Sequence, residues 1–146
     1  MDIVAMDQRH VPQMAALERV CFSDPWSENS IASELENRLS YWLVAEENGR
    51  VLGYIGSQTV LGETDIMNLA VSREHRRKGI ARALLVALMD ALKSQGNRCI
   101  TLEVRQSNLP AQALYEQLGF RQVGLRPNYY RDPKEAALIL RKEYEA

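Results

Sequence analysis

The chain has 146 residues, of which 46% are hydrophobic and 25% are charged, and its formal net charge is −1. This composition predicts one globular domain over residues 1–146 and argues against a nucleic-acid binder, which would carry a strong positive charge. The most apolar segment, residues 80–92, contains Arg82 and Asp90 and is too short to cross a bilayer. Two distant cysteines, without metal-type spacing, exclude a disulfide scaffold and predict no metal site. Together with an N-terminus unlike a signal peptide, they favour the cytoplasm.

The first half of the chain reads as one strand, two helices and three strands. Ser27 follows the helix-breaking Asp24-Pro25 and is the expected N-cap of the second helix. Asn48-Gly49 is a strong hairpin signal between two strand-like runs. The expected elements are a strand over 2–6, a helix from near Asp7 or His10 to the break at 24–27, a helix from there to about 37, and strands over 41–46, 51–59 and 64–71.

The second half alternates helices with strands. Apolar residues at 80, 84, 87, 88 and 91 follow a helical period, and Gly96 is a natural stop. The expected elements are a helix from about 79, a strand over 99–104, a helix over 108–118, and strands over 120–123 and 136–141. The order β-α-α-β-β-β-α-β-α-β-β predicts a mixed, largely antiparallel seven-stranded sheet with four flanking helices, an α/β or α+β fold.

Residues 68–81 are the most informative stretch, because a strand leads through a basic turn into the long helix. A helix N-terminus leaves N–H groups unpaired and carries partial positive charge, so it attracts phosphate. Gly79 lacks a Cβ and lets a ligand approach the backbone, while Arg76, Arg77 and Lys78 add positive charge. Taken alone, these four residues fit a solvated basic loop and a ligand-binding loop equally well. The flanking pattern favours the second interpretation, with a phosphorylated small molecule as the ligand.

Two spaced motifs carry a family resemblance. Arg76-x-x-Gly79-x-Ala81 resembles the acetyl-CoA signature of the GNAT N-acetyltransferases, and residues 108–120 resemble the helix after that family's fifth strand. Four further blocks, Pro25-Trp26-Ser27, Met67–Val71, Glu103–Arg105 and Asn128–Tyr130, are similar to the bacterial RimI branch. The resemblance covers the whole chain. It implies the GNAT fold, acetyl-CoA as cosubstrate, and the N-terminal alanine amine of the eighteenth small-subunit ribosomal protein as acceptor.

The resemblance also implies which residues meet acetyl-CoA. The strand before the basic turn is expected to splay from its neighbour, so that its backbone faces the thioester arm and one of its N–H groups polarises the acetyl carbonyl. The alternative for this strand is simple burial. The residues expected at acetyl-CoA are Leu69, Ala70, Val71, Arg76, Arg77, Lys78, Gly79, Ile80, Ala81, Arg82 and Asn108.

Glu103 and Tyr115 are the candidate general base and general acid. A peptide α-amine has a pKa of roughly 8, so about a tenth is neutral at pH 7 and a modest base suffices. Strand alternation places Glu103 opposite Leu102 and Val104, and Tyr115 lies two helical turns after Asn108. Read alone, Glu103 is an exposed carboxylate, paired with Arg105 for instance, and Tyr115 is a core aromatic. The resemblance assigns them the catalytic roles.

The acceptor side is expected at two aromatic loops. Trp26 lies in the turn between the first helices, and Tyr129 and Tyr130 lie in the connection between the last strands. The resemblance implies that these loops flank the peptide N-terminus, although packing of Trp26 in the core is equally compatible. Lys134 departs from the acidic pattern of relatives, which leaves the fine acceptor preference open. Another amine as acceptor, or a non-catalytic acetyl-CoA sensor, remains an alternative. Cys21 and Cys99 are expected to be buried thiols.

Overall fold

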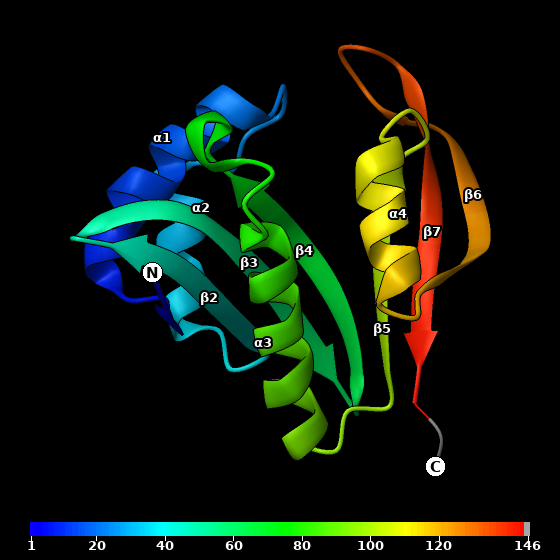
Figure 1. Cartoon of the computed structure of the whole chain (residues 1–146), viewed down its shortest axis with the longest axis horizontal. Coiled ribbons are helices and arrows are strands. Elements are labelled where there is room, and N and C mark those ends of the chain that lie inside the picture. The colour runs from blue at the N-terminus through cyan, green and yellow to red at the C-terminus, as the bar shows by residue number, and fades with distance from the viewer. Residues whose placement is uncertain (145–146) are drawn as a thin grey trace.

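The computed structural model describes residues 1–144 and contains one seven-stranded sheet (Figure 1). Its strand order is β1-β2-β3-β4-β5-β7-β6, and every neighbouring pair is antiparallel except β4 and β5, which are parallel. The predicted element order and mixed sheet are confirmed. The strands are β1 (Asp2–Ala5), β2 (Ser40–Glu47), β3 (Arg50–Val60), β4 (Glu63–Val71), β5 (Cys99–Arg105), β6 (Arg121–Tyr130) and β7 (Glu135–Glu143).

Four α-helices within residues 1–144 cover the two faces of the sheet, with α3 and α4 on one face and α1 and α2 on the other (Figure 1). Side chains alternate between these layers along β2, because successive strand residues point to opposite faces. Leu43 and Ala45 join the larger core under α3 and α4, whereas Trp42 and Val44 join the core under α1. The helices are α1 (Val11–Cys21), α2 (Glu28–Ser33), α3 (Ile80–Ser94) and α4 (Leu109–Gln117), with single 3₁₀ turns at Gln8–His10, Glu34–Glu36 and Arg73–His75.

The predicted start of α2 is confirmed, but its end is earlier than expected. The Ser27 hydroxyl accepts a hydrogen bond from the Ser30 N–H at 3.1 Å. The helix ends at Ser33, and a 3₁₀ turn follows in place of a continuation to residue 37. The buried Glu34 carboxylate accepts a hydrogen bond from Trp42 Nε1 on β2, which favours the tighter turn.

The last hairpin differs most from the expectation. β6 runs to Tyr130, so that Tyr129 and Tyr130 lie in a strand rather than in a connection. The pairing with β7 is interrupted between Arg126 and Tyr130, and Asn128 has a φ of +58°. Residues 124–128 read Gly-Leu-Arg-Pro-Asn, a composition typical of turns. The strand tolerates this sequence because β6 lies at an edge of the sheet and its pairing is irregular there.

The centre of the sheet opens where β4 leaves β5. Only Glu63–Asp65 pair with Cys99–Thr101, and the strands diverge beyond these three pairs (Figure 1). On its other edge, β4 carries a bulge: Asn68 pairs with Gly56 and Ile66 pairs with Ser57, which leaves Met67 as the extra residue. A bulge bends the strand that carries it, so β4 turns away just where its pairing with β5 ends.

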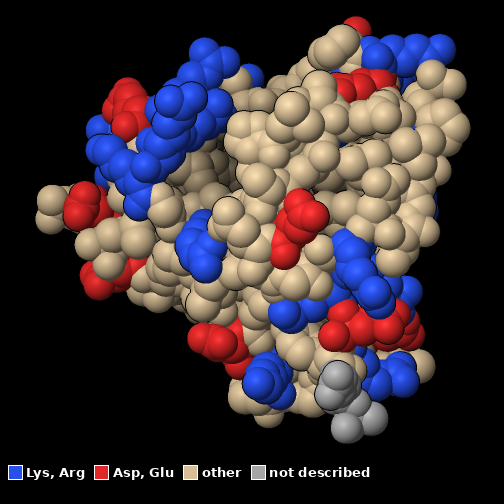
Figure 2. Space-filling view, turned by 45° about the vertical axis from the view of Figure 1, so that its right-hand side comes forward, with Lys and Arg blue, Asp and Glu red and all other residues tan. Residues whose placement is uncertain are grey.

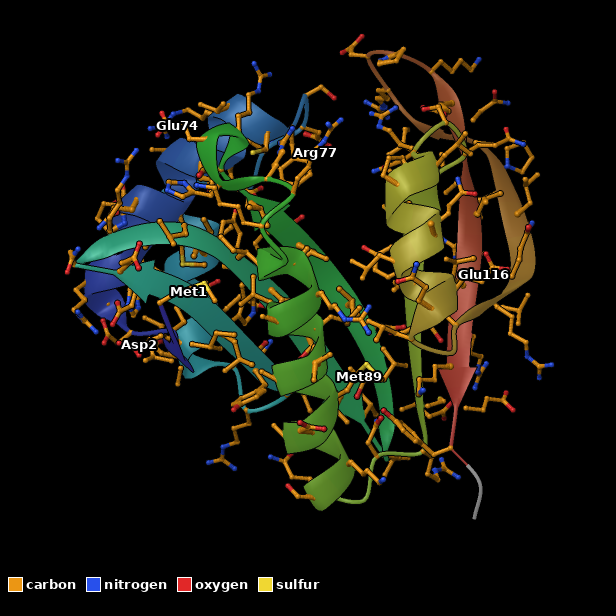
Figure 3. All side chains as sticks on the ribbon, viewed as in Figure 1. Met1, Asp2, Glu74, Arg77, Met89 and Glu116 are labelled. Atoms are coloured by element: carbon orange, nitrogen blue, oxygen red, sulfur yellow. The ribbon has the colours of Figure 1, made fainter. Side chains whose placement is uncertain are left out.

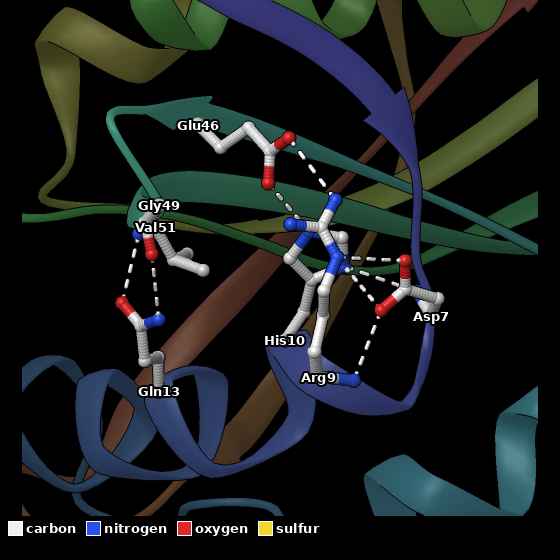
Figure 4. A network of polar contacts seen from close by, with 7 residues as sticks. All are labelled: Asp7, Arg9, His10, Gln13, Glu46, Gly49 and Val51. Atoms are coloured by element: carbon white, nitrogen blue, oxygen red, sulfur yellow. Dashed lines mark hydrogen bonds and ion pairs between the residues drawn. The ribbon is translucent and has the colours of Figure 1, made fainter.

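A polar network fastens the start of α1 to β2 (Figure 4). The buried His10 accepts the Asp7 N–H at Nδ1, so its Nε2 carries the proton and donates to Glu46 at 2.7 Å. Arg9 pairs with both Asp7 and Glu46. The Gln13 side chain, one turn later, holds the hairpin turn through the Gly49 carbonyl and the Val51 N–H.

We expect Glu46→Gln to lower the stability of the fold in a pH-dependent way. The hydrogen bond from His10 and the nearby Arg9 hold the pKa of Glu46 below its usual 4.5. A depressed carboxyl pKa stabilises the fold above the unfolded-state pKa, and this contribution is lost as the pH falls through the folded-state pKa. Urea unfolding should therefore separate wild type from Glu46→Gln at pH 7 and bring them together toward pH 3.

Glu36→Gln is the control, since Glu36 is an exposed carboxylate in the turn after α2. Its effect should be small and should not vary with pH. A constant gap between wild type and Glu46→Gln down to pH 3 would contradict the electrostatic account.

Candidate functional site

The diverging strands form the walls of a cleft of about 810 Å³. Ile66–Leu69 of β4 line one side and Leu102–Arg105 of β5 line the other. The start of α4, the connection between α1 and α2, and the end of β6 with the turn that follows complete it. Of the predicted site residues, Trp26, Leu69, Glu103, Asn108, Tyr115, Tyr129 and Tyr130 line this cleft.

Glu103 lies half-buried on β5, and the predicted alternation with Leu102 and Val104 is confirmed. Burial raises the pKa of its carboxyl, the positive charge of Arg126 opposes this, and the negative charge of Asp65 adds to it. The proposed alternative, an ion pair with Arg105, is wrong, because Arg105 pairs with Glu135 at 3.2 Å. Glu103 is therefore a carboxylate in the cleft with raised proton affinity.

Tyr115 lies both in the hydrophobic core and in the lining of the cleft. Its ring is buried and packs edge-on against Phe120, with a centroid distance of 5.9 Å, so it belongs to the main core. It also lines the cleft, and burial raises its pKa to about 12. The phenol therefore keeps its proton at neutral pH. Asn108 caps α4 by accepting the Ala111 N–H at 3.2 Å, while also bordering the cleft.

The backbone of β4 presents polar groups to the opening. The Ser72 N–H donates to Leu52 of β3, and N–H groups alternate along a strand, so the Leu69 and Val71 N–H groups point away from β3. The Arg76 side chain donates to the Val71 carbonyl at 3.2 Å. Ala70 is buried in the core under α1. The strand is thus both a core element and a wall of the cleft.

The basic loop lies next to the cleft rather than in its lining. Gly79 occupies the N-cap position of α3 with a φ of +79°, and no side chain caps this helix start. A Cβ at Gly79 would meet nothing within 4 Å. The positive φ by itself favours glycine here, and the space beside its Cα is open. Arg77 also has a positive φ, +65°.

The side chains of this loop point in different directions. Arg76, Arg77 and Lys78 are exposed, and Figure 3 shows Arg77 extending from the loop toward the side where α4 lies. Figure 2 shows a large group of Lys and Arg side chains at the upper left, beside a mostly uncharged surface, and smaller groups elsewhere on this face. Ile80 packs in the core, Ala81 is half-buried, and Arg82 reaches Gln117 of α4 at 3.2 Å.

The three predicted acceptor aromatics lie around the cleft. The Trp26 ring packs edge-on against Trp42 with a centroid distance of 5.3 Å, and Trp26 also lines the cleft. Tyr129 and Tyr130 meet edge-on at 5.0 Å. Cys21 is only half-buried and lines the cleft, which corrects its prediction as a buried thiol, whereas Cys99 is buried as expected.

Sequence reasoning missed the importance of Arg105. Its guanidinium donates to the carbonyls of Arg131 and Pro133 and lies over the Tyr130 ring at 4.3 Å. It thereby holds the turn between β6 and β7 against the end of β5. The alternation of side chains along β5 could have indicated this position, since Arg105 falls on the same face of the strand as Glu103.

Two classes of site do not occur within the part of the chain that the structure describes. Over residues 1–144, no group of three or more His, Cys, Asp or Glu side chains is arranged to hold a metal ion. No helix in the same range is long and apolar enough to cross a membrane.

Comparisons with known proteins agree with this geometry. The pattern of the acetyltransferase (GNAT) family matches residues 11–120. The chain is 38% identical, over 94% of both sequences, to the [ribosomal protein bS18]-alanine N-acetyltransferase of Escherichia coli K12. It is also 38% identical to a putative enzyme of that kind from Bacillus subtilis strain 168, over 85% of this chain and 83% of that protein.

Solved structures show the same fold. The crystal structure of the Escherichia coli ribosomal-protein-S18-alanine N-acetyltransferase superposes with a TM-score of 0.91 at 34% identity, covering 99% of this chain and 94% of that one. Ard1 from Thermoplasma volcanium superposes with a TM-score of 0.89 at 22% identity, over 99% of this chain and 98% of that one, which supports the fold alone. The resemblance to the RimI branch is confirmed, and the chain belongs to the acetyltransferase (GNAT) family.

Proposed function

We propose that this protein transfers the acetyl group of acetyl-CoA to the N-terminal alanine of ribosomal protein bS18. The observation that carries the proposal is the cleft between β4 and β5, into which a carboxylate of β5 and a phenol of α4 both face. Similarity to the Escherichia coli enzyme over 94% of both sequences supports the acceptor. We further propose that the reaction takes place in the cytoplasm, without nucleic acid or membrane as partner.

The basic loop fits the pyrophosphate of acetyl-CoA. An uncapped helix start with a left-handed Gly79 leaves backbone donors free, and Arg77 and Lys78 supply charge beside them. The Val71 N–H, which points away from β3, continues this row of donors toward the cleft, and Leu69 lines the cleft beside it. In the proposal, Ala70, Ile80 and Ala81 shape the site through their backbone, while Arg76, Arg82 and Asn108 border it.

The catalytic roles follow from the ionisation of the two side chains. Acetyl-CoA supplies the acetyl group as a thioester. Glu103 accepts the proton of the attacking amine, and its raised pKa makes it a stronger base than an exposed glutamate. The new C–N bond forms as the C–S bond breaks, and Tyr115 donates its proton to the leaving sulfur. These steps need no metal ion.

The aromatic residues are proposed to hold the acceptor peptide. Trp26 on one side and Tyr129 with Tyr130 on the other border the cleft next to Glu103. Arg105 keeps the second group in place through the turn after β6. A cleft bordered by aromatic side chains suits the flexible N-terminus of a protein.

A peptide panel tests the proposed function. The purified chain is incubated with acetyl-CoA and peptides that begin with the bS18 N-terminus, with the same sequence acetylated beforehand, or with an internal lysine as the sole free amine. We expect mass spectrometry to find acetylation at the α-amine of the first peptide. Transfer only to lysine or to a polyamine would support a different acceptor, and coenzyme binding without transfer to any amine would support a sensor.

We expect Glu103→Gln to reduce kcat/KM by about 100- to 10,000-fold, the usual contribution of a general base. Protonation of the peptide α-amine lowers kcat/KM of both proteins below about pH 8. Because the Glu103 carboxyl pKa is raised, wild-type kcat/KM should fall more steeply at lower pH, from above the ordinary glutamate value of 4.5. The variant should keep the first fall and lose the second. Glu116→Gln, on the exposed side of α4, should retain the wild-type profile (Figure 3). A variant profile parallel to that of wild type would assign Glu103 a purely positioning role.

We expect Tyr115→Phe to lower kcat by about 100-fold or more, because the leaving sulfur loses its proton donor while the buried ring is retained. Calorimetry should find the affinity for acetyl-CoA within about twofold of wild type, since no part of the phosphate-binding loop changes. Tyr41→Phe on β2 is the matched control and should leave kcat unchanged. Normal turnover by Tyr115→Phe would exclude Tyr115 as the acid.

A further inference from the structure

Glu18 is a buried carboxylate that the proposed chemistry does not use. It lies on α1, and only 1% of its surface is exposed. Burial raises its pKa, which reflects the cost of holding a charge away from water. Three hydrogen-bond donors from three different parts of the fold offset this cost.

The three donors converge on the two carboxylate oxygens. The Trp26 backbone N–H donates to Oε1 at 2.8 Å. Asn68 Nδ2 donates to Oε2 at 2.6 Å, and the buried Tyr54 hydroxyl donates to the same oxygen. An ionised carboxylate is an acceptor only, so it matches three donors, whereas a glutamine would direct its own NH₂ group at one of them.

Two of these donors belong to walls of the cleft. Trp26 borders the acceptor side, and Asn68 lies on β4 directly after the bulged Met67. Because Glu18 binds Asn68 Nδ2, the amide oxygen of Asn68 faces the other way and accepts the Leu69 N–H at 3.0 Å. Glu18 thus sets the orientation of Asn68 and, through it, of a backbone donor that faces the opening.

We propose that Glu18 is a positioning residue of the acceptor site, which holds the Trp26 turn and the Asn68 amide in register on the β4 side of the cleft. The inference rests on the proposed function. It assigns a role in acceptor binding to a side chain that touches no substrate. Neighbouring Glu34 offers a contrast: it is also a buried carboxylate with several donors, but its partners Ser40, Trp42 and Gln58 lie outside the cleft lining.

The decisive experiment compares Glu18→Gln with Glu34→Gln in steady-state kinetics with the bS18 peptide. Both variants should melt at lower temperature, because each places an NH₂ group among donors. Only Glu18→Gln should raise the peptide KM, by about tenfold or more, which corresponds to the loss of one charge-assisted hydrogen bond. The affinity for acetyl-CoA should stay within about threefold, since the hydrogen-bond partners of Glu18 are Trp26, Tyr54 and Asn68 and none of them belongs to the basic loop.

A second substitution provides the rescue. In Glu18→Gln/Asn68→Asp, the amide introduced on α1 donates to the carboxylate introduced on β4 and still accepts the Trp26 N–H. The introduced carboxylate also accepts the Leu69 N–H. Asn68→Asp alone sets two carboxylates against each other and should impair peptide binding. We expect the double variant to return the peptide KM to within about threefold of wild type. If the role of Glu18 were purely structural, the double variant would regain the wild-type melting temperature but not the wild-type peptide KM.

The possible failures are distinct. A wild-type chain that acetylates no peptide contradicts the proposed function. An active wild type whose Glu18→Gln variant keeps the peptide KM, or shifts it no more than Glu34→Gln, contradicts this inference alone. If Glu18→Gln does not fold, Asn68→Ala removes the same hydrogen bond without touching α1, and an unchanged peptide KM in that variant overturns the proposal.

Discussion

The short parallel pairing of β4 with β5 is the constraint on which the site depends. Three residue pairs join the strands at one end, and no further pairs follow. Because an unpaired strand edge leaves N–H and C=O groups free, the opening offers backbone donors that a continuous sheet would have consumed. The bulge at Met67 bends β4 away from β5, so the cleft is a product of strand geometry rather than of a missing side chain.

An opening in the middle of a sheet has to be held at a defined width, and polar side chains do this from both sides. On the β4 side, Glu18 ties α1 to the strand and to the Trp26 turn. On the β5 side, Arg105 ties the strand to the turn after β6. Arg82 spans the two halves by its hydrogen bond to Gln117. Charged groups suit this task because their hydrogen bonds are shorter and more directional than apolar contacts.

Burial tunes the two candidate catalytic groups in complementary ways. It raises the pKa of Glu103 toward that of the amine, which strengthens the base. It raises the pKa of Tyr115 to about 12, so the phenol stays protonated and available as a donor. Burial therefore raises the proton affinity of both groups.

The sequence by itself determined the local features: the Ser27 cap, the Asn48-Gly49 turn, the start of α3 near Gly79 and the position of Glu103 on the strand face opposite Leu102 and Val104. These depend on turn chemistry and on periodicity, which act over a few residues. Motif resemblance extended the prediction to the family and to seven of the 21 residues that line the cleft. The tertiary structure alone decided the length of β6, the loop contacts of Arg105 and the burial of Glu18. The contacts of Glu18 and Arg105 join groups between 8 and 50 residues apart, and the length of β6 depends on its pairing with β7. These groups are brought together only when the strands pair and the helices pack.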